Sequence, residues 1–254
     1  MQYTLLHPKK ISWRVDIPKN GNILELYGDR TKKDLNNSLD RLKISQYKFC
    51  IEEITKDYLD QFVPLYVTNI ESIKEGIIYD MYDIILHNPK HQDGYKALSL
   101  YLGSEYLGAI LFVVSKSNKL YEIAKVFPKT ILTPLKLNIT FIAEYKLYEY
   151  AVNNNIKYIS LGVDTNYFGR RGNIGLAIYK LRTGAQPYCP KKNDNLIFEN
   201  IIFNHEKDDD MLVFLGTLGK KIEFAKLFLN SKTEYLDKYS QLLQNKKVSV
   251  EIIR

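Results

Sequence analysis

Residues 135–187 read LKLNITFIAEYKLYEYAVNNNIKYISLGVDTNYFGRRGNIGLAIYKLRTGAQP, and this stretch decides the fold. Apolar residues recur every three or four positions from Leu135 to about Val152, which predicts an amphipathic helix. Tyr158 to Val163 is a short apolar run with β-branched members, typical of a strand covered on both faces. A glycine-rich loop and a second helix, Ile174 to Thr183, follow. This order predicts a βαβ-type unit with its chemistry at the carboxyl end of the strand.

Three strand-like runs lie directly upstream of this unit. They are Tyr95 to Leu102, Glu105 to Lys116 and Leu120 to Phe127, and only short turns separate them, which predicts an antiparallel meander. The helix from Leu135 then crosses the sheet, so that the strand at Tyr158 lies parallel to the third meander strand. We therefore predict an α/β (α+β) fold: a mixed central sheet, a central parallel pair of strands that splay at their carboxyl ends, and flanking helices.

The remaining elements follow from the same alternating and helical patterns. Further strands are predicted over Asn22–Tyr27, Tyr47–Ile54, Asn195–Phe203 and Met211–Leu215. One helix is predicted to begin after Asp29 or Thr31, and another to begin at Thr55 and to kink or divide at Pro64. The remaining predicted helices are Tyr79–Leu86, one near Lys220–Leu229 and one near Glu234–Leu243. The chain shows no repeat, low-complexity tract or linker. We expect an N-terminal strand and basic helix (1–45) packed on a single domain (46–254) that ends in a helical extension.

The composition fits a folded protein that binds a charged ligand locally. Hydrophobic residues make up 45% of the 254 residues, enough to bury a substantial core. The formal charge is +7, but 36 basic and 29 acidic residues are mixed along the chain rather than grouped in blocks. The 20 tyrosines are equally scattered, which argues against a stacking platform for nucleic-acid bases. A small molecule that carries a phosphate would need only a local group of these basic side chains to bind it.

Cysteine usage and hydropathy favour a reducing, cytoplasmic location. Cys50 and Cys189 have neither metal nor redox spacing, so we expect two reduced thiols. Charges interrupt the apolar residues near the N-terminus, which argues against a signal peptide. The longest apolar run, Leu107–Val114, is far shorter than the roughly 20 residues of a membrane span, so none is predicted. His87 and His91 have a metal-like spacing without an evident third ligand, so no metal site is predicted either.

Three motifs carry a resemblance to a known superfamily. They are the helix–strand pair EYKLYEYAVNNNIKYISLGVD (144–164), the helix end GLAIYKLRTGAQP (175–187) and the basic helix RTKKDLNNSLDRLK (30–43). With the order of the elements from Arg30 to Pro187, they resemble the GNAT acyltransferase superfamily. The helix end is most similar to that of the Fem-type branch, the peptidoglycan-bridge aminoacyltransferases and their single-domain acetyltransferase-like relatives. The resemblance implies a GNAT-like sheet and an N-acyltransferase activity.

One segment departs from this resemblance. Many acetyl-CoA enzymes of the superfamily carry a glycine-rich loop after the third meander strand, where backbone N–H groups bind the pyrophosphate. Here residues 127–139 read FPKTILTPLKLNI, without one glycine. We still expect Lys129, Lys136 and Asn138 to bind an anion of the donor. Arg170 and Arg171 could clamp a phosphate of the donor or of a nucleotide-linked acceptor, and a solvated turn is the alternative.

The resemblance also implies a mechanism, in which an amine attacks an activated acyl carbon without a covalent intermediate. It places Tyr179 and Lys180 beside the reacting carbonyl, where Lys180 stabilises the oxyanion and Tyr179 protonates the leaving thiolate. Asp164, at the end of the buried strand, is expected to accept the proton or to orient the amine. The alternatives are a packed Tyr179, a solvated Lys180 and an Asp164 that caps the following turn.

On the acceptor side, we expect Arg30 and Lys33 of the basic helix and Glu122 of the third meander strand to bind the substrate. Glu122 is also the second candidate for the base. A solvated basic face is the alternative for the helix that holds Arg30 and Lys33.

The predicted function is acyl transfer from a thioester donor, acetyl-CoA or another acyl-CoA, to an amine of a small-molecule, sugar or peptide acceptor, including cell-envelope precursors. Acyl-CoA is a co-substrate, so no permanently bound cofactor is expected. Two alternatives stay open. One is an aminoacyl-tRNA-dependent aminoacyltransferase of the peptidoglycan-bridge type, whose basic residues would converge on one face to bind tRNA. The other is a non-catalytic GNAT-fold binding protein. The sequence carries no signal for an oligomeric state.

Overall fold

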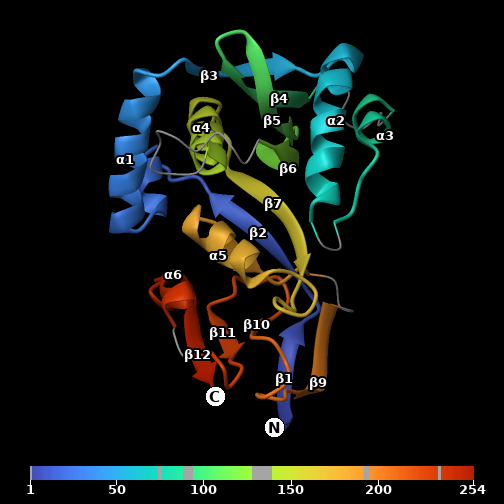
Figure 1. The fold of residues 1–254 in the computed structure, drawn as a ribbon, viewed down its shortest axis with the longest axis vertical. Coiled ribbons are helices and arrows are strands. Elements are labelled where there is room, and N and C mark those ends of the chain that lie inside the picture. Colours follow the sequence, from blue (N-terminus) through green and yellow to red (C-terminus); the bar gives the residue numbers. More distant parts are fainter. Residues whose placement is uncertain (1, 74–75, 88–93, 128–138, 192–194, 234–235) are drawn as a thin grey trace. The chain divides into compact units, whose positions relative to one another are not determined.

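The computed structural model describes all residues except 1, 74–75, 88–93, 128–138, 192–194 and 234–235 (Figure 1). The chain forms two compact units. The meander unit comprises Asp16–Glu25 and Asp29–Ser160, and the terminal unit comprises Met1–Val15, Leu26–Gly28 and Leu161–Arg254. These divisions do not coincide with the predicted boundary between residues 45 and 46, which stays a prediction.

The meander unit is built on four consecutive antiparallel strands: β3 (Tyr47–Glu53), β4 (Tyr95–Leu102), β5 (Glu105–Val114) and β6 (Lys119–Val126). The predicted meander is therefore confirmed. Strand β7 (Tyr158–Thr165) begins in this unit and pairs in parallel with β6, from Lys119 opposite Tyr158 to Tyr121 opposite Ser160. Pairing is confined to the amino ends of both strands, as expected for a pair that splays at its carboxyl ends. The predicted GNAT-like α+β class is confirmed.

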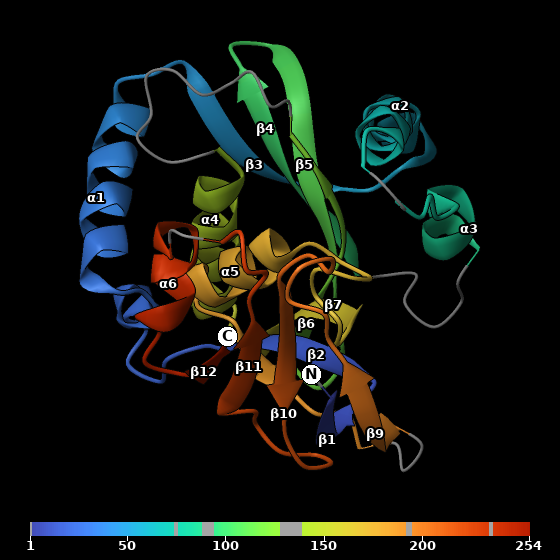
Figure 2. The same ribbon diagram turned by 60° about the horizontal axis from the view of Figure 1, so that its bottom comes forward.

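Helices cover both faces of this sheet, with α1 (Asp29–Lys43) and α4 (Ile139–Asn153) on one face and α2 (Lys56–Glu71) and α3 (Met81–Leu86) on the other (Figures 1 and 2). The alternation along β5 explains both layers. Leu111 packs in the core beneath α2, whereas the next residue, Phe112, contacts Tyr150 of α4. The meander strands thus read as apolar runs because they are covered on two sides.

Helix α2 corrects one prediction. Thr55 caps it as expected, since its side chain accepts a hydrogen bond from the N–H of Tyr58. Pro64 does not divide the helix, which continues to Glu71, and the alternative of a kink at this residue stays a prediction. The neighbours Phe62 and Tyr66 are buried against the sheet, and this packing holds the helix together on both sides of the proline.

The terminal unit contains the strands that the sequence shows least clearly. Strands β1 (Gln2–Pro8) and β9 (Leu196–Ile202) form an antiparallel pair, and β2 (Lys10–Asp16) pairs with β8 (Gln186–Tyr188) and neighbours β7. A further sheet holds β10 (Met211–Leu215), β11 (Phe224–Phe228) and β12 (Ser249–Ile253). The helices are α5 (Ile174–Arg182) and the short α6 (Ser240–Leu243). None of the helices described in either unit is long and apolar enough to cross a membrane.

Two predicted elements are wrong, and both are short. The predicted strand over Asn22–Tyr27 contains the one-turn helix Ile23–Leu26, because Asn20 and Asn22 form local hydrogen bonds that favour a turn. The predicted helix near Lys220–Leu229 is strand β11, because β10 and β12 supply hydrogen-bonding partners on both sides. The C-terminal extension is thus largely strand, and its helical part begins at Asp237.

Asp210 organises the end of the terminal unit. Its buried carboxylate accepts hydrogen bonds from the backbone N–H of Asn230 and from the side chains of Thr233, Lys238 and Tyr239. Burial alone would raise the pKa of Asp210, but these hydrogen bonds outweigh it and hold the pKa below its ordinary value. The carboxylate therefore ties the segment after β11 to the start of β10.

We expect this anchor to be lost in acid. The folded-state pKa of Asp210 lies below the unfolded value, near 4. Its contribution is therefore present above the unfolded pKa and disappears as the pH falls through the folded pKa. Asp210→Asn should weaken this dependence, so urea midpoints measured below about pH 4 should change less with pH than in wild type. Asp209→Asn, at the exposed neighbour, is the matched control and should retain the wild-type slope.

A second prediction concerns the β5–β6 pairing. Gly108 has a φ of +143°, and an added Cβ would lie 2.2 Å from the carbonyl oxygen of Val126. Gly108→Ala should therefore destabilise the fold by about 2 kcal/mol or more, measured by urea unfolding. Gly103→Ala in the preceding turn, with a φ of +60° and nothing within 4 Å, should cost clearly less. Equal losses would show that backbone conformation, not the close approach to Val126, requires glycine at position 108.

Candidate functional site

A buried ion pair lies at the carboxyl end of β7. Lys180 of α5 donates a hydrogen bond from Nζ to Oδ2 of Asp164 (2.8 Å) and another to the carbonyl oxygen of Leu161 (3.1 Å). The indole Nε1 of Trp13 donates to the same Asp164 oxygen at 2.7 Å. Lys180 is only 7% exposed, and its Nζ lies 5.6 Å from the centroid of the Trp13 ring. One carboxylate oxygen therefore receives two donors in a largely dry environment.

The local sequence explains this arrangement. Ile11, Trp13 and Val15 alternate along β2 and are fully buried, which points the indole into the interior of the unit. Lys180 occupies the buried stripe of α5, where the helical period would place an apolar residue. Asn173 caps this helix by accepting a hydrogen bond from the N–H of Gly175. Lys180 is thus held inside by its helix, and Asp164 neutralises its charge there.

The structure decides between the alternatives for two predicted residues. Asp164 does not cap the following turn, because within the described residues its hydrogen-bond donors are Trp13 and Lys180. Lys180 is not a solvated helix residue, because it is buried and ion-paired. Tyr179 is half-buried on α5, and since successive helical residues point about 100° apart, it faces a different side from Lys180. The predicted pair of Asp164 and Lys180 is brought together, while their catalytic roles stay predictions.

Asp164 keeps a chemically usable oxygen. Its side chain is 21% exposed, and Oδ1 has no hydrogen-bond partner among the residues described. An amine could therefore donate a hydrogen bond to Oδ1 while Trp13 and Lys180 hold Oδ2. This arrangement gives Asp164 a fixed orientation and an open acceptor.

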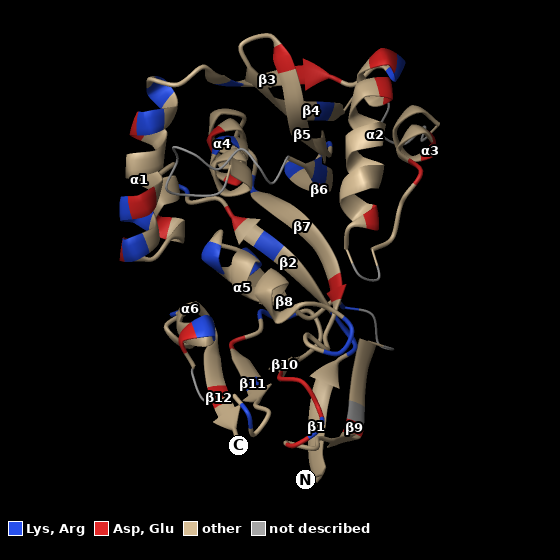
Figure 3. Ribbon diagram, viewed as in Figure 1, with Lys and Arg blue, Asp and Glu red and all other residues tan. Residues whose placement is uncertain are grey.

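A basic pocket of about 490 Å³ lies in the same unit, lined by Lys9, Lys10, Thr165, Tyr167, Arg170, Arg171, Ile197 and Glu199. Figure 3 shows the basic residues of the loop between β7 and α5 in blue. Arg170 donates hydrogen bonds to the carbonyl oxygen of Ile202 (2.8 Å) and to Asp208 (3.1 Å), so part of its charge is already compensated. Lys9, Lys10 and Arg171 are exposed and form no ion pair with the described residues. The pocket therefore has a surplus of positive charge.

The lysines of this pocket sit on a rigid corner between β1 and β2. The side chain of Asn195 accepts from the N–H of Lys10 and donates to its carbonyl oxygen. Asn166, which is fully buried, donates to the carbonyl oxygens of Pro8 and Phe214. These amides fix the backbone at residues 8–10 and leave the lysine side chains at the surface.

The other predicted site residues belong to the meander unit or lie outside the described residues. Glu122 belongs to the meander unit and pairs with Lys125 at 3.0 Å, and Lys125 also contacts the buried Glu144. Arg30 and Lys33 are exposed on α1. The predicted donor residues Lys129, Lys136 and Asn138, and the histidine at position 91, lie outside the described residues. Across the part of the chain that is described, no group of three or more His, Cys, Asp or Glu residues could hold a metal ion.

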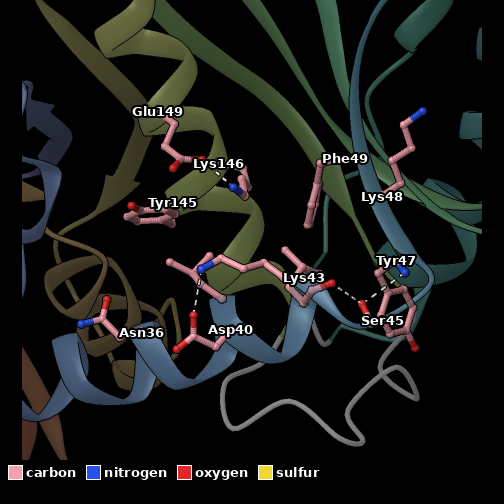
Figure 4. Close-up of a pocket in the computed structure, with 12 residues that line it drawn as sticks. Asn36, Asp40, Lys43, Ser45, Tyr47, Lys48, Phe49, Tyr145, Lys146 and Glu149 are labelled. Atoms are coloured by element: carbon pink, nitrogen blue, oxygen red, sulfur yellow. Dashed lines mark hydrogen bonds and ion pairs between the residues drawn. The ribbon is translucent and has the colours of Figure 1, made fainter.

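A larger cavity, about 740 Å³, lies in the meander unit between α1, β3 and α4 (Figure 4). Four of its charged residues form two ion pairs: Lys43 contacts Asp40 at 2.9 Å, and Lys146 contacts Glu149 at 2.7 Å. Because these ion pairs consume most of its charge, it lacks the cationic surplus of the basic pocket. None of the predicted site residues that the structure describes lines this cavity.

Sequence reasoning missed Trp13, Lys9, Lys10, Tyr167 and Glu199. A usable signal was present in KISWRVD (10–16), where apolar and polar residues alternate as in a half-buried strand and the single tryptophan of the chain lies on the apolar side. No comparable local signal marks Glu199, which reaches the pocket only because β9 pairs with β1.

No protein-family model matches the chain, and no curated protein sequence matches it. Solved structures align with the chain at low sequence identity. FemX aligns with a TM-score of 0.51 and 12% identity over 70% of this chain, which spans 59% of the FemX chain. L-PGS from Bacillus licheniformis aligns with a TM-score of 0.46 and 12% identity, covering 68% of this chain and 51% of that one. The C-terminal domain of a putative lysylphosphatidylglycerol synthetase from Agrobacterium fabrum aligns with a TM-score of 0.45 and 13% identity, covering 71% of this chain and 53% of that one. The likeness to FemX shows a shared fold, in agreement with the GNAT-like class.

The ion pair makes a testable prediction about stability. Lys180→Met removes the charge but keeps the aliphatic stem, and it leaves the Asp164 carboxylate with one of its two donors. We expect a loss of about 3 kcal/mol in the free energy of unfolding, since removing one partner strands a poorly solvated charge. The double variant Lys180→Met/Asp164→Asn should lose less than the sum of the two single losses. Strictly additive losses in urea unfolding would mean that the pair contributes no coupling energy.

Proposed function

We propose that this protein is a Fem-type acyltransferase of the GNAT fold. It would move an acetyl or other acyl group from a thioester donor, an acyl-CoA, to an amine of the acceptor. The observation that carries this proposal is the buried pair of Asp164 and Lys180 at the carboxyl end of β7, with an open acceptor oxygen on Asp164. The fold shared with FemX and the aromatic-Lys motif at 179–180 support it. Acyl-CoA is a cytoplasmic metabolite, so the proposal includes a cytoplasmic location.

The proposed reaction is a single displacement. The acceptor nitrogen forms a bond to the acyl carbon, the carbon–sulfur bond breaks, and the amine proton passes to Oδ1 of Asp164. In this proposal Lys180 stabilises the oxyanion and Tyr179 gives the leaving thiolate its proton. When Asp164 becomes protonated, it no longer neutralises Lys180, so the positive charge becomes available as the oxyanion develops. The ion pair would thereby couple proton transfer to charge stabilisation.

The basic pocket suits a substrate that carries a phosphate. Lys9, Lys10 and Arg171 offer exposed cations on a backbone fixed by Asn195 and Asn166. Lysine and arginine are the usual partners of phosphate oxygens. We therefore propose an anionic acceptor, such as a phosphate-linked cell-envelope precursor, and retain the predicted phosphate role of the loop at 170–171.

A second candidate function is aminoacyl transfer from charged tRNA. Two observations favour it: the fold shared with FemX, and the absence of glycine from residues 127–139, where acetyl-CoA enzymes of the superfamily have a glycine-rich loop. The same displacement would then release a ribose hydroxyl instead of a thiol. Binding should in that case weaken steeply with salt concentration.

Asp164→Asn and Lys180→Met should each lower turnover by about 10²-fold, the scale of one lost proton acceptor or oxyanion donor. Transfer is measured as thiol release from acetyl-CoA and longer acyl-CoAs, and as loss of aminoacyl ester from charged tRNA, each with a panel of amine acceptors. Lys207→Met, at an exposed lysine without an ion pair, is the control and should keep the wild-type rate. Unfolding curves show whether each variant is folded under the assay conditions.

The outcomes separate the candidates. Turnover with acyl-CoA supports the first function, and turnover with charged tRNA alone supports the second. If the folded wild-type protein uses no donor, the remaining interpretation is a non-catalytic binding protein. Full activity in both variants would remove Asp164 and Lys180 from the mechanism.

A further inference from the structure

Three side chains meet beside the basic pocket in a cluster that acyl transfer does not explain. They are His7 of β1, Glu199 of β9 and Tyr167 of the loop after β7. His7 is fully buried, and its Nε2 lies 2.9 Å from Oε1 of Glu199 and 3.0 Å from the hydroxyl of Tyr167. Tyr167 also donates a hydrogen bond to Oε1 of Glu199. A buried ring and a tyrosine hydroxyl thus converge on one carboxylate oxygen.

The hydrogen bonds fix the state of this cluster. Nδ1 of His7 lies 3.1 Å from the carbonyl oxygen of Pro8, which can only accept, so Nδ1 carries a proton. The pKa of Glu199 lies below its ordinary value, chiefly because Tyr167 donates a hydrogen bond to it and further because of the contact with His7 and the positive charge of Arg171. Glu199 is therefore a carboxylate held in a set orientation.

This carboxylate stands among cations that it does not pair with. Glu199 lines the same pocket as Lys9, Lys10 and Arg171, and its side chain is 40% exposed. Among the described residues no lysine or arginine forms an ion pair with it, and its contact is with the ring nitrogen Nε2 of His7. A fixed negative charge weakens the binding of a simple anion in such a pocket. A pocket for phosphate alone would bind more tightly without it.

A carboxylate in an anion-binding pocket becomes favourable if the ligand carries a hydrogen-bond donor beside its anionic group. His7 and Tyr167 occupy Oε1, and Oε2 has no partner among the described residues. A hydroxyl or ammonium group next to the phosphate would donate to Oε2, while the surrounding cations bind the phosphate oxygens. The carboxylate then rejects ligands that lack such a donor, since Oε2 faces their phosphate oxygens with no hydrogen atom between them.

We propose that Glu199 is a specificity-determining residue of the basic pocket, which takes a phosphate ester with a hydroxyl or amine donor on a neighbouring carbon. His7 and Tyr167 are positioning residues that hold the carboxylate. This inference rests on the anion-binding role of the pocket in the proposed function. It adds the requirement for a second group on the ligand.

Calorimetric titration of the full chain with three small probes tests this inference. Ethyl phosphate has no donor, glycerol 3-phosphate has a hydroxyl donor at equal charge, and phosphoethanolamine has an ammonium donor. Wild type should bind at least one donor-bearing probe about tenfold more tightly than ethyl phosphate, the scale of one charge-assisted hydrogen bond. The donor-bearing probe with the higher affinity shows whether the pocket prefers a hydroxyl or an ammonium group.

Glu199→Gln should tighten the binding of ethyl phosphate and abolish the preference. Glu206→Gln removes the same charge at an exposed position outside the pocket and should keep the wild-type ratio. The wild-type ratio needs no variant, so a poorly folded Glu199→Gln leaves the test intact. Equal affinity of wild type for all three probes, or no binding of any, overturns the inference. Because no turnover is measured, a protein that transfers no acyl group can still show the preference, and an active enzyme can fail to show it.

Discussion

A lysine that is only 7% exposed must be neutralised, and this requirement shapes the centre of the terminal unit. Lys180 receives its counter-charge from Asp164 of β7 and gives a second hydrogen bond to the β7 backbone at Leu161. The Trp13 indole completes the arrangement from β2. One helix and two strands are thereby fixed to each other by polar contacts that leave little geometric freedom. A buried ion pair of this kind contributes little net stability compared with apolar packing of similar volume, whereas removing one of its partners leaves a poorly solvated charge.

The sequence predicts the meander unit well because its signals are local. The strands from Tyr95 to Phe127 are apolar runs separated by tight turns, and each pairs with its neighbour in the chain. The terminal unit is harder because its pairings are remote: β1 pairs with β9 across most of the chain, and β2 pairs with β8. The helix predicted over the residues of β11 is wrong for a related reason, because the hydrogen bonds from β10 and β12 decide the conformation of this short segment and its own sequence does not. The wrong strand over Asn22–Tyr27 has a different cause, because there local side-chain hydrogen bonds override the alternating pattern.

The residues of the candidate site also differ in how readily the sequence reveals them. Asp164, Lys180, Arg170 and Arg171 lie within one short segment whose strand, loop and helix are readable, so residue type and position suggest them. Glu199 and Lys10 lie far from that segment in sequence, and only the folded sheet brings them to the loop. The environment of Lys180 depends on its burial, which the local sequence does not show. Whether Lys180 is solvated or ion-paired depends on Trp13, which no helical pattern around residue 180 could reveal.

The pleat of β7 constrains what a substrate of the proposed enzyme must look like. Adjacent strand residues point to opposite faces, and Asp164 faces the ion pair whereas Thr165 lines the basic pocket. An acceptor with its phosphate in the pocket would have to pass the end of β7 to bring an amine to Oδ1 of Asp164. The pleat therefore places the proton acceptor of the proposed reaction and a lining residue of the basic pocket on opposite faces of one strand, a single residue apart.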